Sequence, residues 1–565
     1  MKSKIFFGCL LLAGGMITSS CSDFLTEDPK GQLEPTTYYS SSEAINSALY
    51  ALYTQVNVSQ IYTNMLYPQW QGDDITANPG SNKQACAAID AFSADSDNKG
   101  ITDSWAKNYK IIAAADNIIN NISAKTTDSY YEDAQVAKAQ AKFWRAFAYY
   151  YLVRLYGPLP IIEEATSEYN QQPPSTIEEV YNYIVKDLTE AIEVLPTSYS
   201  TQPANHDGVD AFVTKQAAQS TLVAVYMSMA GYPLNKDGYY AKAAALAEDV
   251  INHNSEYGFY LDSDWSHVYS MGHNYNKETI LGIDYSPLPW WSNDSEFTSC
   301  DRFESLGDGG WGDAWGEIAF WKRFPEGKRK AYTYAPKITF QDKNAYVIVK
   351  TCDWWALDSE GNKVVSEYHP MFCQFTVNAD EQGNAIRAPY DYTKPNWKGM
   401  VNDHRHRVIR YSELLLWYAE SVARSGGDLT KAKTYLKQVR ERACDDPYNV
   451  TLSDGSVVSI DAMSADQLAE ACYIEHGWEV AGYWVAMVTR RSDEFRMNEL
   501  KKNFDFRVAN AEQDIVDPAD GKVYKAKESV PVVKTEWKGA ESIYLPYPVL
   551  EVEKNPNLKN VDRTK

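Results

Sequence analysis

Apolar side chains recur every three or four positions through much of the chain, and this spacing puts them on one face of an α-helix. Within 139–156, Phe143, Phe147, Tyr151 and Leu155 lie four positions apart. They form one apolar stripe, as on a helix that buries one side against a core. A Gly-Pro pair follows directly and ends the helix. The segment is therefore predicted to be a core-facing helix of a scaffold.

The same periodicity predicts further helices at 41–56, 103–122, 176–195, 211–230, 240–252, 409–424, 429–443 and 466–489. Ser175 or Thr176 is the expected N-cap of the third of these, which carries Glu178 and Glu179 in its first turn. Several of the helices form antiparallel pairs joined by short turns, which is the repeating unit of helical solenoids. Because the pairs are unevenly spaced, the sequence predicts a mostly α protein built from an interrupted array of tetratricopeptide-like helix pairs.

Two long stretches, 57–102 and 254–407, lose the helical periodicity, and the second is rich in glycine, proline and tryptophan. Long irregular stretches in a compact protein are usually functional loops. We therefore expect a helical scaffold formed by 36–56, 103–253 and 408–489, with the ligand site on the two irregular stretches.

Residues 1–20 have the layout of an export signal. Lys2 and Lys4 precede a short apolar stretch, which is followed by small residues and then by Cys21. The stretch is shorter than the roughly 20 apolar residues of a membrane span. A cysteine in this place is what bacterial lipoprotein processing requires, so we expect lipid on Cys21 and an anchored mature body spanning 21–565. A plain secreted protein cut nearby is the alternative.

Composition narrows the classes of ligand. The formal net charge is −22, and a field of that sign repels phosphate backbones, so nucleic acid is not an expected partner. The chain has 16 Trp and 41 Tyr beside 18 Phe. Trp and Tyr combine a flat apolar face with a polar edge. This bias suits ligands that are half apolar and half polar, such as sugars.

Neither a metal nor a cofactor is expected. The cysteines after Cys21 fit no zinc motif, and any disulfide pairing among them stays open. His404-Arg405-His406 would place two imidazoles together, but Arg405 and Arg407 disfavour a bound cation. We therefore expect a solvated basic loop there. The sequence has no phosphate loop, H-E-x-x-H motif or nucleophile elbow.

A sugar-binding surface needs exposed Trp or Tyr rings, on which apolar sugar faces stack, near short polar side chains that bond the hydroxyls. The irregular stretches offer such groups at two places. The candidate ligand-binding residues are Trp70, Asp73, Asp74, Trp290, Trp291, Asn293, Trp311 and Trp315. The alternative for any one of these tryptophans is that its side chain is buried in the helical core and anchors the loop there.

The late segment 466–489 also allows two interpretations, an amphipathic helix on a membrane or a helix of the domain. Glu470, Glu475 and Glu479 favour a domain helix with an acidic edge.

Four places along the chain resemble the SusD/RagB family of outer-membrane nutrient-binding lipoproteins from Bacteroidetes. They are CSDFLTEDP (21–29), AKFWRAFAYYYLVRLYGP (141–158), RYSELLLWYAE followed by VRER (410–420 and 439–442), and YLPYP followed by NPNL (544–548 and 555–558). They occur in the order that the family has and span the whole mature chain.

The resemblance implies a mostly helical, non-catalytic protein whose loops hold oligosaccharides outside the cell. It also implies a lipid-anchored place at the outer-membrane surface and a partner, a TonB-dependent transporter of the SusC type. Some members bind peptides instead, so a peptide-binding role is one alternative. A surface glycoside hydrolase is a second, because acidic residues are plentiful, although sequence cannot show the carboxyl pair at a defined separation that such an enzyme needs.

Overall fold

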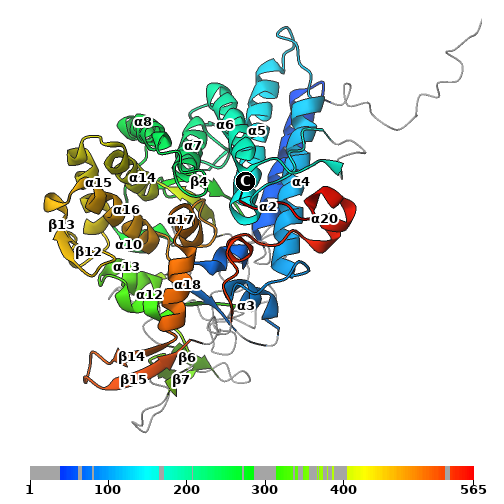
Figure 1. Ribbon diagram of the computed structural model, residues 1–565. Helices are drawn as coiled ribbons and strands as arrows, with labels where there is room; N and C mark the ends of the chain where they lie inside the picture. The colour runs from blue at the N-terminus through cyan, green and yellow to red at the C-terminus, as the bar shows by residue number, and fades with distance from the viewer. Residues whose placement is uncertain are drawn as a thin grey trace, which may run out of the picture.

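The protein is described from a computed structural model (Figure 1). The structure describes residues 39–564 except 62–66, 79, 81, 165–170, 207, 270–272, 286–312, 335–337, 342–347, 356–364, 367, 373–377, 380–384, 387–403 and 529–534.

A row of antiparallel helices forms the body of the molecule, so the mostly helical fold class is confirmed. Successive helices pack against one another from α2 and α4 through α8, and α14 then packs against α8, α15 and α16 (Figure 1). The row comprises α2 (Ser42–Ile61), α4 (Lys99–Asn121), α5 (Tyr131–Tyr156), α6 (Ile177–Val194), α7 (Lys215–Ala230), α8 (Gly238–Asn252), α14 (Tyr411–Ser425), α15 (Leu429–Glu441) and α16 (Ala465–Glu479).

Helix ends follow local chemistry. Thr176 rather than Ser175 caps α6, since its hydroxyl accepts from the Glu179 N–H while the Glu179 carboxylate accepts from the Thr176 N–H.

The helix expected at 466–489 ends ten residues early, at Glu479. Gly482 has a φ of +67°, and a Cβ there would lie 2.3 Å from the Phe372 ring. The chain must therefore turn at this position instead of continuing as a helix.

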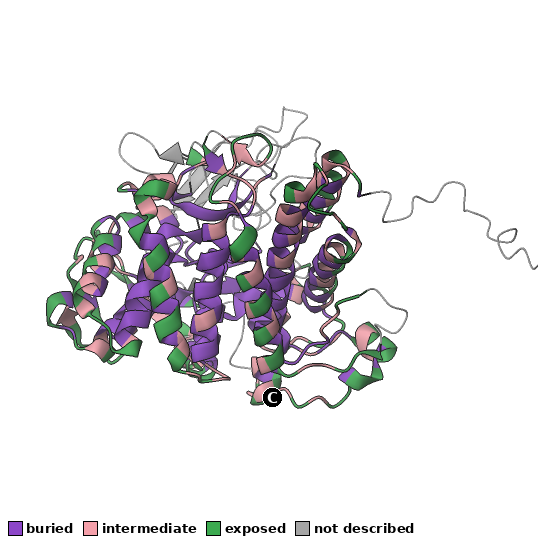
Figure 2. Cartoon of the chain, turned by 90° about the horizontal axis from the view of Figure 1, so that it is seen from above, coloured by how far each residue is buried: buried purple, intermediate pink, exposed green. Residues whose placement is uncertain are grey.

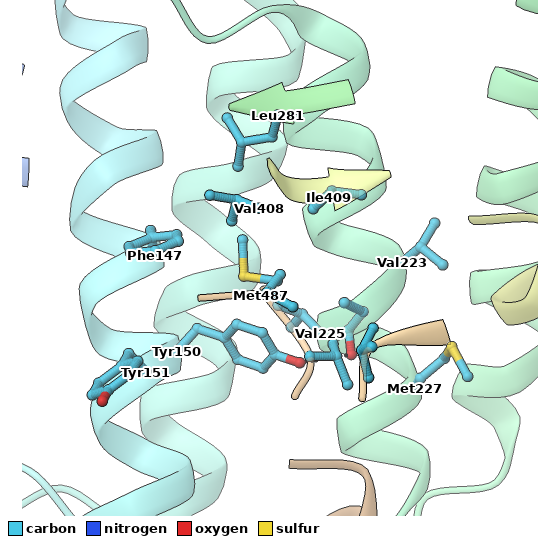
Figure 3. Close-up of a cluster of buried hydrophobic side chains, with 14 of the residues drawn as sticks. Phe147, Tyr150, Tyr151, Val223, Val225, Met227, Leu281, Val408, Ile409 and Met487 are labelled. Atoms are coloured by element: carbon cyan, nitrogen blue, oxygen red, sulfur yellow. Dashed lines mark hydrogen bonds between the residues drawn. The ribbon is translucent and has the colours of Figure 1, made fainter. Parts of the chain in front are cut away.

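The core lies between the helix row and two short strands. β4 (Thr279–Ile283) and β11 (His406–Arg410) pair antiparallel, and every residue of both is buried. Figure 3 shows Leu281, Val408 and Ile409 of these strands in one cluster with Phe147 of α5 and other apolar side chains. From above, buried positions line the inward faces of the helices, and exposed positions line their outer faces (Figure 2). The apolar positions that recur every 3.6 residues in the sequence are therefore the positions that face the core.

Shorter elements complete the fold. The remaining helices and 3₁₀ turns are η3 (Tyr67–Gln71), α3 (Gln84–Asp90), α9 (Asn254–Tyr257), α10 (Trp265–Val268), α12 (Ile318–Arg323), α13 (Lys328–Thr333), η6 (Ile460–Ala462), α17 (Arg490–Arg496), α18 (Leu500–Ala509), α19 (Ala540–Ile543), α20 (Val549–Lys554) and η8 (Pro556–Leu558). The remaining strands are β1 (Ile75–Ala77), β2 (Asn205–His206), β3 (Val209–Asp210), β5 (Ala314–Gly316), β6 (Ile338–Gln341), β7 (Ile348–Cys352), β8 (Val365–Ser366), β9 (Asn378–Ala379), β10 (Ala385–Ile386), β12 (Asn449–Thr451), β13 (Val457–Ser459), β14 (Glu512–Val516) and β15 (Val523–Lys527).

The two stretches expected to be irregular meet in space. β1, from 57–102, pairs antiparallel with β5, from 254–407. Trp315 of β5 faces Thr76 of β1 in this register. Backbone pairing therefore joins segments that are more than 200 residues apart in the sequence.

The acidic edge expected on 466–489 is wrong for two of its three glutamates, because Glu475 and Glu479 are fully buried. Arg329 donates to both, at 2.6 Å to Glu475 Oε1 and 2.7 Å to Glu479 Oε2. Arg410 and Arg442 donate to Glu479 Oε1 at 2.8 and 2.6 Å. Burial alone would raise the pKa of Glu479, but Arg442, Arg410 and Arg329 hold it well below its usual range. The glutamates are the anionic centre of a buried ion cluster.

Within the described part of the chain, the helices are all too short or too polar to traverse a lipid bilayer. Three of the described cysteines, Cys86, Cys444 and Cys472, are free thiols.

Glu479→Gln should destabilise the protein by about 3–5 kcal/mol, because it leaves three buried guanidinium groups without their shared carboxylate. Urea unfolding at pH 7 measures the change. Asp466→Asn, on the exposed first turn of the same helix, is the matched control and should change the free energy of unfolding by no more than about 0.5 kcal/mol. Equal effects of the two substitutions would contradict the role assigned to the cluster.

Candidate functional site

Trp70 was expected on an exposed loop, and this expectation is wrong. It belongs to η3 and is 0% exposed. Its ring lies 5.2 Å from that of Trp484 in an edge-to-face arrangement and 4.8 Å from that of Tyr67. A ring enclosed by other rings has no face left for a ligand, so the buried Trp70 side chain anchors the 57–102 stretch to the core.

Asp73 and Asp74 are also buried, so the expectation that they face a ligand is wrong as well. Arg490 Nε donates to Asp73 Oδ1 at 2.7 Å, and Arg323 pairs with Oδ2. Asp74 Oδ2 accepts from the backbone N–H of Gly482 at 2.8 Å. Burial, with a smaller contribution from Asp73, raises the pKa of Asp74 to about 7. Both acids tie their loop to the segment around α17.

Trp315 is 6% exposed and belongs to a small second core with Trp354, Trp355 and Ile318. It is therefore not the exposed stacking platform that the sequence suggested. Trp290, Trp291, Asn293 and Trp311 lie outside the described residues, so their roles stay predictions.

A cavity of about 250 Å³ lies where α2, α5, the β2–β3 hairpin and the end of β4 come together. Half of its lining residues carry an aromatic ring. The lining residues are Tyr53, Asn57, Trp144, Pro203, His206, Ala211, Phe212, Tyr275, Gly282, Ile283, Asp284 and Tyr285. Such a cavity, apolar with a few polar groups, is the usual form of a small-molecule site.

The aromatic walls are fixed by ring–ring contacts. Tyr53 stacks on Phe212 with centroids 4.3 Å apart, and the Trp144 ring meets Tyr53 edge-to-face at 5.6 Å. The Tyr53 hydroxyl donates to Gln140 Oε1 at 2.5 Å and accepts from the Val213 N–H at 2.9 Å. Also in the lining, His206 stacks on Tyr275 with ring centroids 5.0 Å apart. These rings are held in place before any ligand arrives, which lowers the entropic cost of binding.

The His404–Arg407 segment lies behind the cavity. We expected a solvated basic loop, but all four side chains are buried in or beside β11. Arg405 Nε lies 2.8 Å from Asp284 Oδ1, and Arg405 Nη2 donates to the Asp210 carbonyl at 2.6 Å. A Cβ on Gly282 would lie 2.2 Å from Arg405 Nε. Only glycine therefore lets the guanidinium approach the strand so closely.

The two histidines of this segment act as packing groups. His406 lies 4.5 Å from the Tyr285 ring, centroid to centroid. Burial, then His404 and Arg407, lower the pKa of His406 well below its usual value, so the ring is neutral. His404 Nε2 is hydrogen-bonded to the Tyr269 carbonyl at 2.8 Å. Across the described residues, no group of three or more His, Cys, Asp or Glu side chains could hold a metal ion.

Sequence reasoning missed the ring pair Tyr53 and Phe212, because both fell inside segments expected to be helical. Tyr53 does lie on α2, whereas α7 begins only at Lys215 with Thr214 as its N-cap. That threonine, followed by a run of good helix formers, was the available signal that Phe212 precedes the helix. No local pattern shows that the two rings stack.

Two family models match most of the chain. One, described as starch-binding associating with outer membrane, matches residues 23–227, and the other, described as the SusD family, matches residues 330–562. A SusD-like protein from Bacteroides ovatus is 23% identical, with 99% of this chain and 97% of that protein aligned.

Solved structures share the fold. The surface glycan-binding protein A from Bacteroides uniformis superposes with a TM-score of 0.64 at 19% identity, covering 93% of this chain and 100% of that one. A crystal structure with xylogluco-oligosaccharide gives a TM-score of 0.61 at 19% identity, covering 92% of this chain and 98% of that one.

The burial of Asp74 predicts a pH-dependent contribution to stability. Its pKa is raised from 3.8 to about 7, so the folded protein keeps the proton up to about pH 7, whereas the unfolded chain loses it near pH 4. The stability that this proton contributes is therefore complete below about pH 4 and is lost as pH rises to about 7. Asp74→Asn keeps the side chain uncharged throughout. Between pH 4 and 8, the free energy of unfolding of the wild type should therefore fall by about 2–4 kcal/mol more than that of Asp74→Asn.

Urea unfolding at each pH measures this difference, and Asp466→Asn is again the control. Parallel profiles for the wild type and Asp74→Asn would show that the carboxyl is ionised in the folded protein.

Proposed function

Because the chain belongs to the SusD family of carbohydrate-binding proteins, we propose that it is a non-catalytic surface lipoprotein of the outer membrane. In this role it binds oligosaccharides and passes them to a SusC-type TonB-dependent transporter. The observation that carries the proposal is the preformed cavity walled by Tyr53, Trp144, Phe212, Tyr275 and Tyr285. Rings with apolar faces and polar edges match the two-sided character of a sugar.

The comparisons support a glycan as the ligand class. One structural neighbour is named a surface glycan-binding protein, and another was crystallised with xylogluco-oligosaccharide. Oligosaccharides of this kind are therefore the first ligands to test on this chain.

The described lining of the cavity supports binding without catalysis. It contains a single carboxylic acid, Asp284, whereas glycoside hydrolysis ordinarily uses two carboxyl groups flanking the bond to be cleaved. The carboxylate of Asp284 is also engaged with Arg405. A purified protein that binds oligosaccharide should therefore release no reducing sugar from it.

The anchoring and delivery steps rest on the sequence. Lipid on Cys21 would hold the body at the membrane while leaving it in water. A binding protein tethered beside a transporter raises the local concentration of its ligand there, because the second encounter becomes intramolecular.

A screen of the body that begins after Cys21 should find at least one binder among neutral plant, host and microbial oligosaccharides, xylogluco-oligosaccharide included. Calorimetry measures affinity, and a reducing-sugar assay on the same samples should stay at background. Binding should change less than twofold between 0.05 and 0.5 M NaCl, because stacking on a neutral ring involves no long-range charge.

If no glycan binds and basic peptides bind in a salt-sensitive way, the ligand is a peptide and not a glycan. Reducing-sugar release would identify a hydrolase instead.

Cys21→Ser should move the protein from the membrane fraction to the soluble fraction, because the thioether that carries the lipid cannot form. Fractionation and detergent partitioning of the full-length protein measure the shift. Cys86→Ser, at a buried free thiol, is the control and should leave the membrane fraction unchanged. Retention of the Cys21→Ser protein in the membrane would contradict lipid anchoring at this residue.

A further inference from the structure

We infer that the ring-lined cavity accepts one uncharged sugar unit, at a chain end or a branch, and discriminates against uronate or sulfated units. This inference rests on the proposed function and adds the ligand class of that site. It follows from the size of the cavity and from the charges around it.

The size limits the occupant to a single unit. Pockets for drug-sized molecules have volumes of about 300–1,000 Å³, and this cavity has about 250 Å³. It is closed behind by β4 and β11, where Tyr285 packs on His406 and Arg405 approaches Gly282. A site of this volume has room for one sugar unit, and the strand behind it favours entry of a terminal or branching unit.

The charges disfavour an anionic unit. No lysine or arginine is among the described lining residues, and the ionisable side chains there, apart from the tyrosines, are Asp284 and His206. His206 Nε2 lies 3.6 Å from Asp284 Oδ2. A sugar carboxylate or sulfate would thus enter a ring-lined space next to the acidic side chain of Asp284, where the described lining offers no lysine or arginine to pair with it. Burying an anion without a full set of donors is costly.

The nearest buried cation does not compensate. Arg405 is 1% exposed, and its guanidinium is engaged by the Asp284 carboxylate, the Asp210 carbonyl and the face of the Tyr275 ring at 5.4 Å. It acts as a positioning residue that fixes Asp284 and the back wall. A neutral sugar loses no charge solvation on entry and can place its C–H faces against the rings.

Ala211 offers a test of the location, since its side chain lines the cavity and makes no polar contact of its own. Ala211→Phe fills the space without removing a wall. It should weaken binding of the neutral oligosaccharide found in the screen at least tenfold, measured by calorimetry. Ala519→Phe, at an exposed position of the β14–β15 turn, is the matched control and should bind within twofold of the wild type.

The test of charge uses the same oligosaccharide and its derivative with the primary hydroxyls oxidised to carboxylates. The two probes differ only in charge at C6. The wild type should bind the oxidised form at least tenfold more weakly. Ala211→Lys places an ammonium group at the cavity. It should reduce the ratio of the affinity for the neutral form to that for the oxidised form at least threefold. In both variants, a thermal unfolding midpoint close to that of the wild type shows that the fold is kept.

The outcomes separate the inference from the proposed function. If the wild type binds no glycan, the proposed function fails and the inference with it. If it binds and Ala211→Phe binds equally well, the glycan site lies elsewhere and the inference fails alone. Equal or tighter binding of the oxidised form would overturn the preference for neutral units while leaving glycan binding in place.

Discussion

The constraint on which the rest of the structure depends is the pairing of buried charges around Glu475 and Glu479 of α16. The arginines that neutralise them come from three other elements: Arg329 from α13, Arg410 from β11, and Arg440 and the adjacent Arg442 from the end of α15. An unpaired charge in a protein interior costs several kcal/mol. These elements must therefore all be in place together, and the cluster joins the irregular 254–407 stretch to the helical row.

Strand β11 connects this ion cluster to the cavity. Arg410, at one end of β11, reaches the ion cluster, whereas Arg405, just before the other end, meets Asp284 at the back of the cavity. Between them, Val408 and Ile409 are buried in the hydrophobic core (Figure 3). The strand is thus held by ion pairs at both ends and by apolar packing in the middle. A rigid back wall of this kind suits a site that distinguishes ligands by shape and charge.

A second group of buried ions secures the 57–102 stretch. Asp73 pairs with Arg490 and Arg323, and Asp74 accepts from the backbone at Gly482. On α16, His476 lies between Asp493 of α17 and Glu413 of α14. Burial opposes the charge on this imidazole, but the two carboxylates raise the pKa of His476 to about 9. Charged residues that the sequence marked as candidates for a ligand site thus hold loops against the helices. The rings that line the cavity come from other parts of the chain.

Periodicity was enough to find the long helices of the row, because the repeat of apolar side chains along a helix depends only on neighbours three or four positions away. It did not predict the short helices within 57–102 and 254–407 or those after residue 489. It predicted both ends of α6, with Ser175 or Thr176 as its cap, and the C-terminal end of α5, but it missed the start of α5 at Tyr131. It failed wherever the outcome depended on remote partners. Trp70 is buried because Trp484 covers it, and the basic segment at 404–407 is buried because acids and carbonyls distant in sequence neutralise it.

By itself, the sequence determined the helical class and the likeness to one family, and it predicts the export signal with Cys21. The tertiary structure alone decided which rings and charges line the cavity and which are buried in the core. The physical reason is that burial is set by what packs against a side chain. Tyr53 and Phe212 stack across 159 positions of chain, and no spacing within either segment encodes that contact.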